Sequence, residues 1–237
     1  QASKVMNSLW GAGQMMFNKI LVMADQGVKI QDYEALAKYV FKNLNPTTDI
    51  YFSTGPMDVL DHSCSKLGFG GKMCIDGTTK FDEEVEEGYE LRVMSFGLDE
   101  KLLKGKFSEI HAVNTSLFKK EIPCLIISVE KNRPGHIKEL HEQICALEEI
   151  EGVKMILYVE HTVDANDITT ALWRFCNNLD PKRDNLLCKR PTSNFKPQTS
   201  NMYFACMGFD GTRKTKEYDN FQRDWPNIIV ADDETIR

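Results

Sequence analysis

One segment of the chain occurs twice at a constant offset. Residues 19–49 read KILVMADQGVKIQDYEALAKYVFKNLNPTTD, and residues 154–184 read KMILYVEHTVDANDITTALWRFCNNLDPKRD. Pro46 and Pro181 are 135 positions apart (181 − 46 = 135). The stretches 74–80 and 208–214 share an Asp-Gly-Thr-x-Lys pattern at an offset of 134 (208 − 74 = 134). This pattern indicates a duplicated module; the alternative is two similar strand–helix units in one ordinary α/β domain.

Each copy predicts a strand, a helix and the start of a second strand. In the first copy, the apolar run 20–24 is typical of a buried strand. Gln31 or Asp32 is a candidate helix cap, and apolar residues then recur at helical spacing up to Leu44. Asn45-Pro46 ends that helix, because proline cannot continue it.

The remaining chain predicts further alternation of helices and strands. We expect helices at 1–18 and 136–150, and strands at 72–76, 107–118, 122–130, 202–209 and 227–230. Segments 53–71 and 189–201 are expected to be loops, and 82–90 an acidic solvated join. The predicted fold class is α/β, with two tandem modules, each a small mixed β-sheet covered by helices, at residues 1–90 and 105–237.

Composition excludes several classes of function. The net charge of −6 argues against a general nucleic-acid or anionic-membrane surface, and no apolar run is long enough to span a bilayer. Seven scattered cysteines without a CxxC pair are typical of reduced thiols in a cytoplasmic protein, with no zinc site expected. Both ends look cut, since Gln1 enters a helical pattern without a cap and 232–237 resembles a first helical turn, so a fragment is expected.

Several stretches resemble one family. They are QASKVMNSLWGAGQMMFNKILVMAD at the start, the Asn45-Pro46…Asp49 strand start, and GGKMCIDGTTK at 70–80. In this order and spacing they resemble the C-terminal domain of the UbiD family, the prenylated-FMN-dependent reversible decarboxylases that include the polyprenyl-4-hydroxybenzoate decarboxylases. The match is close over residues 1 to about 85, and residues 122–220 are similar more faintly.

The resemblance implies how this region serves the whole enzyme. The family's flavin site, divalent metal ligands and acid–base residues lie in an N-terminal region that precedes Gln1, so no catalytic residue and no metal ligand is expected here. By motif position, Lys4 matches a cofactor-contacting lysine. The segment from Gly55 to His62 matches a substrate-capping loop, with Met57, Val59 and Leu60 as its apolar residues. In the second copy Glu139 stands at the position of Lys4, which implies lost cofactor binding.

Each candidate has a simpler alternative. Lys4 is also compatible with a solvated surface lysine, and Met57, Val59 and Leu60 with a loop that tucks into the local core. The glycine-rich stretch 67–72 fails the phosphate-loop pattern and is expected to be a turn into a strand. Asp76 and Asp210 recur in both copies, which favours a fold-stabilising Asx-type turn.

Two functions follow as hypotheses. The first is the C-terminal part of a UbiD-type carboxy-lyase acting on an aromatic or α,β-unsaturated acid, such as a 4-hydroxybenzoate-type quinone precursor. This chain would supply cofactor contact, capping and homo-oligomerisation, and alone it is expected to be inactive with no cofactor bound. The second is a non-catalytic assembly module. An unrelated nucleotide-binding protein is disfavoured by the missing phosphate loop.

Overall fold

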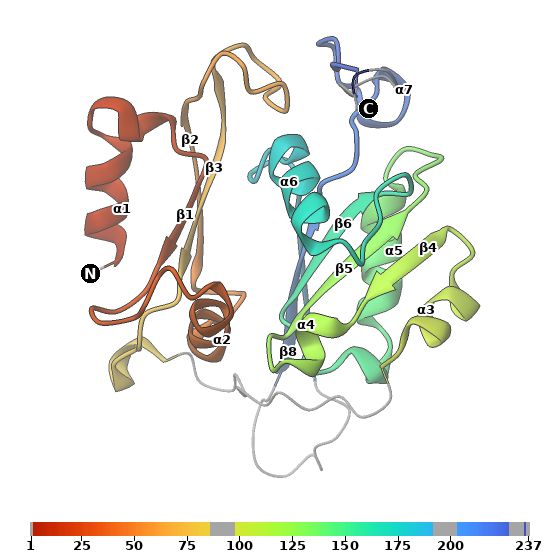
Figure 1. Ribbon diagram of the computed structural model, residues 1–237, viewed down its shortest axis with the longest axis horizontal. Coiled ribbons are helices and arrows are strands. Elements are labelled where there is room, and N and C mark those ends of the chain that lie inside the picture. Colours follow the sequence, from red (N-terminus) through yellow and green to blue (C-terminus); the bar gives the residue numbers. More distant parts are fainter. Residues whose placement is uncertain (1, 86–97, 192–202, 228–234, 236–237) are drawn as a thin grey trace.

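The computed structural model describes residues 2–85, 98–191, 203–227 and 235. Two units follow each other along the chain, and we call residues 2–85 the first unit and residues 98–227 the second (Figure 1). The first unit contains α1 (Ala2–Trp10), η1 (Gly13–Phe17), β1 (Ile20–Met23), α2 (Tyr33–Asn43), β2 (Ile50–Pro56), β3 (Phe69–Asp76) and η2 (Asp82–Glu84). Its three strands form a sheet in the order β1-β3-β2.

The second unit repeats this order after two added strands. It contains α3 (Glu100–Lys106), β4 (Ile110–Asn114), α4 (Ser116–Lys119), β5 (Cys124–Val129), α5 (His136–Cys145), η3 (Glu148–Ile150), β6 (Met155–Glu160), α6 (Ile168–Asn178), β7 (Asn185–Pro191), β8 (Tyr203–Asp210) and α7 (Lys216–Asp219). Its sheet has the order β4-β5-β6-β8-β7. The pairing β6-β8-β7 has the same parallel and antiparallel directions as β1-β3-β2. This common topology is the one expected of a duplicated module.

The repeated sequence motifs form the same local structures in both units. Asp32 and Asp167 each cap a helix, accepting from the backbone N–H three residues later at 3.1 Å. Asp76 accepts from the N–H of Thr78 at 3.0 Å, and Asp210 from that of Thr212 at 3.0 Å. The predicted Asx-type turns are therefore present, and they shape the exit from β3 and β8.

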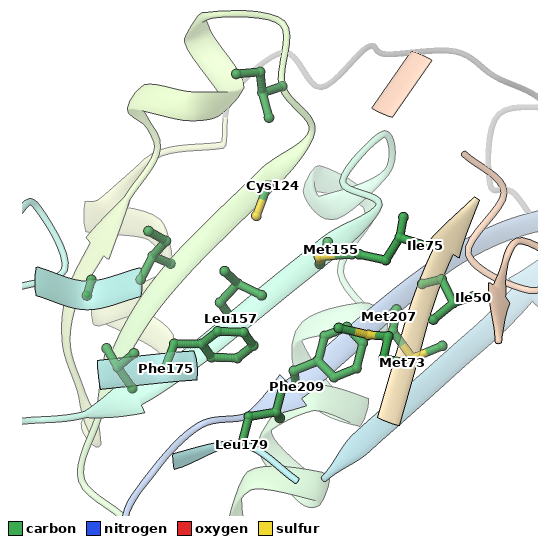
Figure 2. Packing of buried hydrophobic residues seen from close by; sticks show 14 of the residues in the cluster. Ile50, Met73, Ile75, Cys124, Met155, Leu157, Phe175, Leu179, Met207 and Phe209 are labelled. Carbon is green, nitrogen blue, oxygen red and sulfur yellow. The ribbon is translucent and has the colours of Figure 1, made fainter. Parts of the chain in front are cut away.

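The two units share one hydrophobic core. Figure 1 shows α2 and α6 between the two sheets, with α1 on the outer face of the three-stranded sheet. Buried residues from both units meet in this middle layer, including Ile50, Met73 and Ile75 of the first unit and Met207 and Phe209 of the second (Figure 2). A second core fills the other face of the five-stranded sheet, beneath α3 and α5. The units are therefore packed as one body rather than joined only by a linker.

Two lysines at equivalent positions each donate hydrogen bonds to the other unit. Lys154 donates from Nζ to the carbonyl oxygens of Phe41 (2.5 Å) and Leu44 (2.8 Å), at the end of α2. Lys19 donates to those of Cys176 (3.0 Å) and Leu179 (3.0 Å), at the end of α6. Each unit thus supplies a cation to the negative end of the other unit's helix, where backbone carbonyls lack helical partners.

Several predicted boundaries were wrong, because tertiary pairing overrides local propensity. The predicted loop 53–71 is strand at both ends, since β2 continues to Pro56 and β3 begins at Phe69. Gly71 lies within β3 because the second unit approaches there: its N–H donates to Asp180 Oδ2 at 3.1 Å, and an added Cβ would lie 2.7 Å from the backbone nitrogen of Lys182.

The other differences are at element ends. The predicted helix 1–18 breaks after Trp10 and resumes as η1, whose first residue Gly13 has a φ of 52°. The predicted strand 107–118 is β4 followed by α4, and α3 was not predicted. The predicted helix 136–150 ends at Cys145, and the predicted loop 189–201 contains the end of β7. The predicted strand 227–230 lies, beyond Asn227, outside the described residues.

Candidate functional site

The first candidate is Lys4 on α1. Only Ala2 of this helix is buried, and Lys4 is exposed. Its backbone carbonyl accepts from Ser8 Oγ at 2.9 Å, but its side chain makes no hydrogen bond or ion pair to any described residue. The ammonium group is therefore available for an anion, which is the property expected of a phosphate contact.

The equivalent position in the second unit is different. Glu139, on α5, accepts from Arg133 Nε at 3.0 Å and from Arg133 Nη2 at 2.7 Å. The helix itself is packed into the core, with His136, Ile137, Leu140, His141, Ile144 and Cys145 buried. The second unit thus offers an engaged carboxylate on a covered helix where the first offers a free ammonium on an exposed one.

The segment matched to a capping loop divides into buried and exposed residues. Met57 is 2% exposed, whereas Val59 is 65% and Leu60 86% exposed. Met57 Sδ lies 3.4 Å from the Nζ of Lys72, a fully buried lysine of β3 that donates to the carbonyls of Met16 and Asn18. Burial lowers the pKa of Lys72. Met57 therefore belongs to the local core, while Val59 and Leu60 project from the loop.

The second unit holds the base of this loop. Arg183 Nη1 donates to the carbonyl of Ser63 at 2.7 Å, and Arg223 Nη1 to that of Cys64 at 2.7 Å. Ser63 Oγ donates to the carbonyl of Leu179 at 2.9 Å. The second unit therefore fixes the base of the loop by hydrogen bonds. The apolar tip, Val59 and Leu60, is left exposed.

A cavity of about 470 Å³ lies between this loop and the end of α6. It is lined by Asn18, Lys19, Ile20, Leu60, Asp61, His62, Cys176 and Asn177. Lys19 forms a 2.7 Å ion pair with Asp61, and burial lowers the pKa of His62. The Oδ1 of Asn18 is buried without a hydrogen-bond partner among the described residues. The cavity is therefore lined by both charged and polar side chains.

The first unit also has an open sheet edge. In the second unit β5 pairs in parallel with β6, whereas the equivalent edge of β1 has no partner strand within residues 2–85, 98–191 and 203–227. Large exposed hydrophobic side chains gather in the same unit. In the described residues the second unit has only Leu172, Trp173 and Leu187, and the first has Val5, Met15, Val22, Ile30, Tyr33, Tyr51, Val59, Leu60, Leu67, Phe69, Phe81 and Val85. The first unit therefore leaves more large apolar side chains exposed than the second.

The sequence did not predict every notable group. Lys19 and Lys154 were visible as an identical pair in the repeat, but nothing in the sequence indicated that they cross between the units. The burial of Lys72 had no signal, because charged residues are rarely buried. His141, Cys145 and Cys206 also come together only in the fold.

Among the described residues, no helix has the length and apolarity to cross a membrane.

Relatives of the chain span a larger protein. An uncharacterised protein of Helicobacter pylori strain 26695 is 30% identical over 237 residues, covering 99% of this chain and 34% of the relative. An uncharacterised protein of Aquifex aeolicus is 42% identical over 83 residues, which cover 35% of this chain and 17% of that relative. The chain therefore spans about a third of the length of the H. pylori relative.

Two solved structures are similar to parts of the chain. The vanillic acid decarboxylase of Sedimentibacter hydroxybenzoicus is 19% identical, with a TM-score of 0.45 over 58% of this chain and 29% of that chain. HmfF of Pelotomaculum thermopropionicum, solved in complex with FMN, is also 19% identical, with a TM-score of 0.39 over 53% of this chain and 28% of that chain.

The family model gives the assignment. The model described as the 3-octaprenyl-4-hydroxybenzoate carboxy-lyase C-terminal domain matches residues 1–77 and 98–211, so it covers most of both units. The resemblance seen in the opening motifs is thereby confirmed, and the chain belongs to the UbiD family through its C-terminal domain.

Proposed function

We propose that this chain is the C-terminal region of a carboxy-lyase that removes CO2 from an aromatic or α,β-unsaturated acid, of the 4-hydroxybenzoate type used as a quinone precursor. Prenylated FMN and a divalent metal ion would be bound mainly by the N-terminal region of the same protein. The observation that carries the proposal is the free ammonium of Lys4 on an exposed helix, in contrast to the Arg133-paired Glu139 at the equivalent position.

The chain's own residues would bind the cofactor phosphate by charge and would cover the bound substrate. The Lys4 ammonium is a compact, flexible cation that suits a flavin phosphate. The exposed side chains of Val59 and Leu60 would cover the substrate and exclude water, while the contacts from Arg183 and Arg223 hold the loop base in place. When bound, prenylated flavin would supply the electron sink for the electron pair that stays on the substrate carbon as CO2 leaves.

The open edge of β1 fits the docking of the N-terminal region. In the second unit β5 covers the matching edge of β6 with a parallel strand. We propose that a strand of the N-terminal region adds to β1 in the same way, satisfying its unpaired backbone groups and covering Val22, which is 50% exposed. The same exposed unit would contribute to a homo-oligomer of the whole enzyme, which we place in the cytoplasm.

The role of Lys4 is testable in the full-length enzyme. Lys4→Ala is expected to lower flavin content or kcat/KM about ten- to a hundredfold, because a hydrogen bond to a charged partner contributes about 1.5–3 kcal/mol. The fold should be unaffected, since alanine is a good helix former. Flavin absorbance per chain and CO2 release from a panel of aromatic acids are the measurements.

Glu139→Ala is the matched control for Lys4→Ala. It removes the other charge at the equivalent helical position and is expected to leave flavin content and turnover nearly unchanged. Normal flavin content and rate in Lys4→Ala, or greater damage from Glu139→Ala, would contradict the assigned roles.

The capping role is tested separately with Leu60→Ser. Because Leu60 is 86% exposed, its replacement should change the free energy of unfolding by less than about 0.5 kcal/mol. If the side chain covers the substrate, kcat/KM falls by up to about a hundredfold, which corresponds to the transfer free energy of one leucine. Leu187→Ser, at a half-exposed site of the second unit, is the control and should leave kcat/KM unchanged.

A non-catalytic assembly module is the second candidate function, and the large exposed apolar side chains of the first unit favour it. It predicts that Lys4→Ala and Leu60→Ser both leave turnover unaltered in an enzyme with normal flavin. The two candidates therefore give opposite results in the same experiments.

A further inference from the structure

A cluster of thiols around one histidine lies in the core beneath α5. His141 and Cys145 are four residues apart on α5, so their side chains share one face of the helix. Cys188 of β7 and Cys206 of β8 are directly opposite each other in the antiparallel register. Helix and strands thus bring together four side chains that lie up to 65 positions apart in the sequence (206 − 141 = 65).

Three of the four side chains are at metal-ligand spacing, and Cys188 joins them through its register opposite Cys206. The ligand atoms of His141, Cys145 and Cys206 all lie within 4.8 Å of one another, and all three residues are buried. Cys145 Sγ is 3.5 Å from His141 Nε2. A tetrahedral zinc ion requires separations of about 3.6 Å between sulfur and nitrogen and about 3.8 Å between two sulfurs.

The surroundings of His141 fit a metal ligand as well. Its Nδ1 lies 2.9 Å from the Tyr158 hydroxyl, which leaves Nε2 facing Cys145. A ligating histidine commonly donates its other ring N–H to such a partner. The ring lies against Gly208, where an added Cβ would be 2.6 Å from Nδ1, so the strand makes room for it.

We propose that His141, Cys145, Cys188 and Cys206 bind one structural zinc ion in a Cys3His site. The site is closed, with four protein ligands and no open position, and it ties α5 to β7 and β8 in the second unit. Zinc thiolate binding releases the thiol protons and adds its free energy to folding. The alternative is a core of reduced thiols around a histidine that hydrogen-bonds the Tyr158 hydroxyl.

The first unit does not contain this ligand set. At the equivalent positions, with offsets of 135 and 134, it has Met6, Trp10, Ser53 and Lys72. There the Nζ of Lys72 lies 5.9 Å from the centre of the Trp10 ring, a cation–π contact that fills the same place. The proposed zinc site therefore belongs to the second unit alone, which predicts a stoichiometry of one ion per chain.

The experiment is a metal count on the full-length protein. After purification with zinc in the medium and dialysis against metal-free buffer, mass spectrometry of the metals is expected to find one zinc per chain that depends on this cluster. Replacement by Co2+ should give intense thiolate-to-cobalt charge-transfer absorption. Cys206→Ser and Cys188→Ser should lose that zinc, and Cys124→Ser, at a buried cysteine of β5 outside the cluster, should retain it.

A further variant separates loss of zinc from unfolding, which Cys206→Ser and Cys188→Ser could cause. Tyr158→Phe keeps all four ligands and is expected to weaken zinc binding about ten- to a hundredfold in a chelator competition. The proposal is overturned if the folded wild-type protein shows no thiolate–cobalt absorption, if zinc content is the same in wild type and Cys188→Ser, or if Cys188 and Cys206 are found as a disulfide.

Discussion

Replacing Phe209 with alanine is expected to lower the free energy of unfolding by about 3–5 kcal/mol. The side chain is fully buried on β8, and its ring centre lies 6.3 Å from those of both Phe52 and Phe175. Phe52 belongs to the first unit and Phe175 to the second, so this ring packs where the two units meet (Figure 2). Its removal leaves a cavity whose walls come from both units.

The control for Phe209→Ala is the same substitution at Phe81, which is 68% exposed. Phe81→Ala should change stability by less than about 0.5 kcal/mol. Urea denaturation followed by tryptophan fluorescence gives both values. A single transition is expected for both proteins, because the units share a core. A loss below about 1 kcal/mol for Phe209→Ala, or separate transitions for the two units, would contradict the shared core.

Lys154→Ala is expected to destabilise the protein by about 2–5 kcal/mol. The change leaves the buried carbonyls of Phe41 and Leu44 without this donor, at about 1–3 kcal/mol each. It also deletes three buried methylenes (Cγ, Cδ and Cε), at about 0.8 kcal/mol each. Relief of the buried charge offsets about 3 kcal/mol of this, because burial lowers the pKa of Lys154 to about 8 from its usual 10.5.

The same pKa gives a dependence on pH. Between about pH 8 and 10.5 the unfolded chain holds a proton on Lys154 that the folded chain has lost, so stability from this group rises with pH. Below pH 8 both states are protonated and the cost of the buried charge is constant. The stability difference between wild type and Lys154→Ala should therefore widen by up to about 3 kcal/mol from pH 7 to pH 10.

Urea midpoints at several pH values measure both effects of Lys154→Ala. Lys42→Ala, at an exposed lysine near the end of α2, is the control and should show neither the loss nor the pH trend. A stability difference that narrows as the pH rises would contradict the burial of a charged amine at Lys154.

The sequence predicted those parts of the fold that depend on local patterns. The β1 and β6 runs, the helices capped by Asp32 and Asp167, and the Asx-type turns at Asp76 and Asp210 are set by residues near one another in the chain. The strand ends of β2, β3 and β7 were missed. These residues are in strands only because they hydrogen-bond to a neighbouring strand, which the local sequence does not show. Gly71 gave a loop signal, and the glycine is there to admit Asp180 of the second unit.

The site was predictable only in part. Motif position indicated Lys4 and the loop from Gly55 to His62, and the structure places Lys4 in solvent and divides the loop into a buried Met57 and an exposed Val59 and Leu60. The thiol–histidine cluster had no signal, because its members are spread over α5, β7 and β8 without a CxxC pair. Such contacts depend on how the strands and helices are arranged in space, and no short stretch of sequence indicates them.

The reciprocal lysines have a consequence for how the two units can change. In a symmetric homodimer every substitution is made twice, so a residue lost from one subunit is lost from both. Here Lys19 and Lys154 join two similar bodies within one polypeptide, and the linker holds the partners at a high effective concentration. Each unit can then change independently of the other. The first unit keeps α1 exposed with a free lysine, while the second unit buries the equivalent helix α5 and has buried cysteines beneath it.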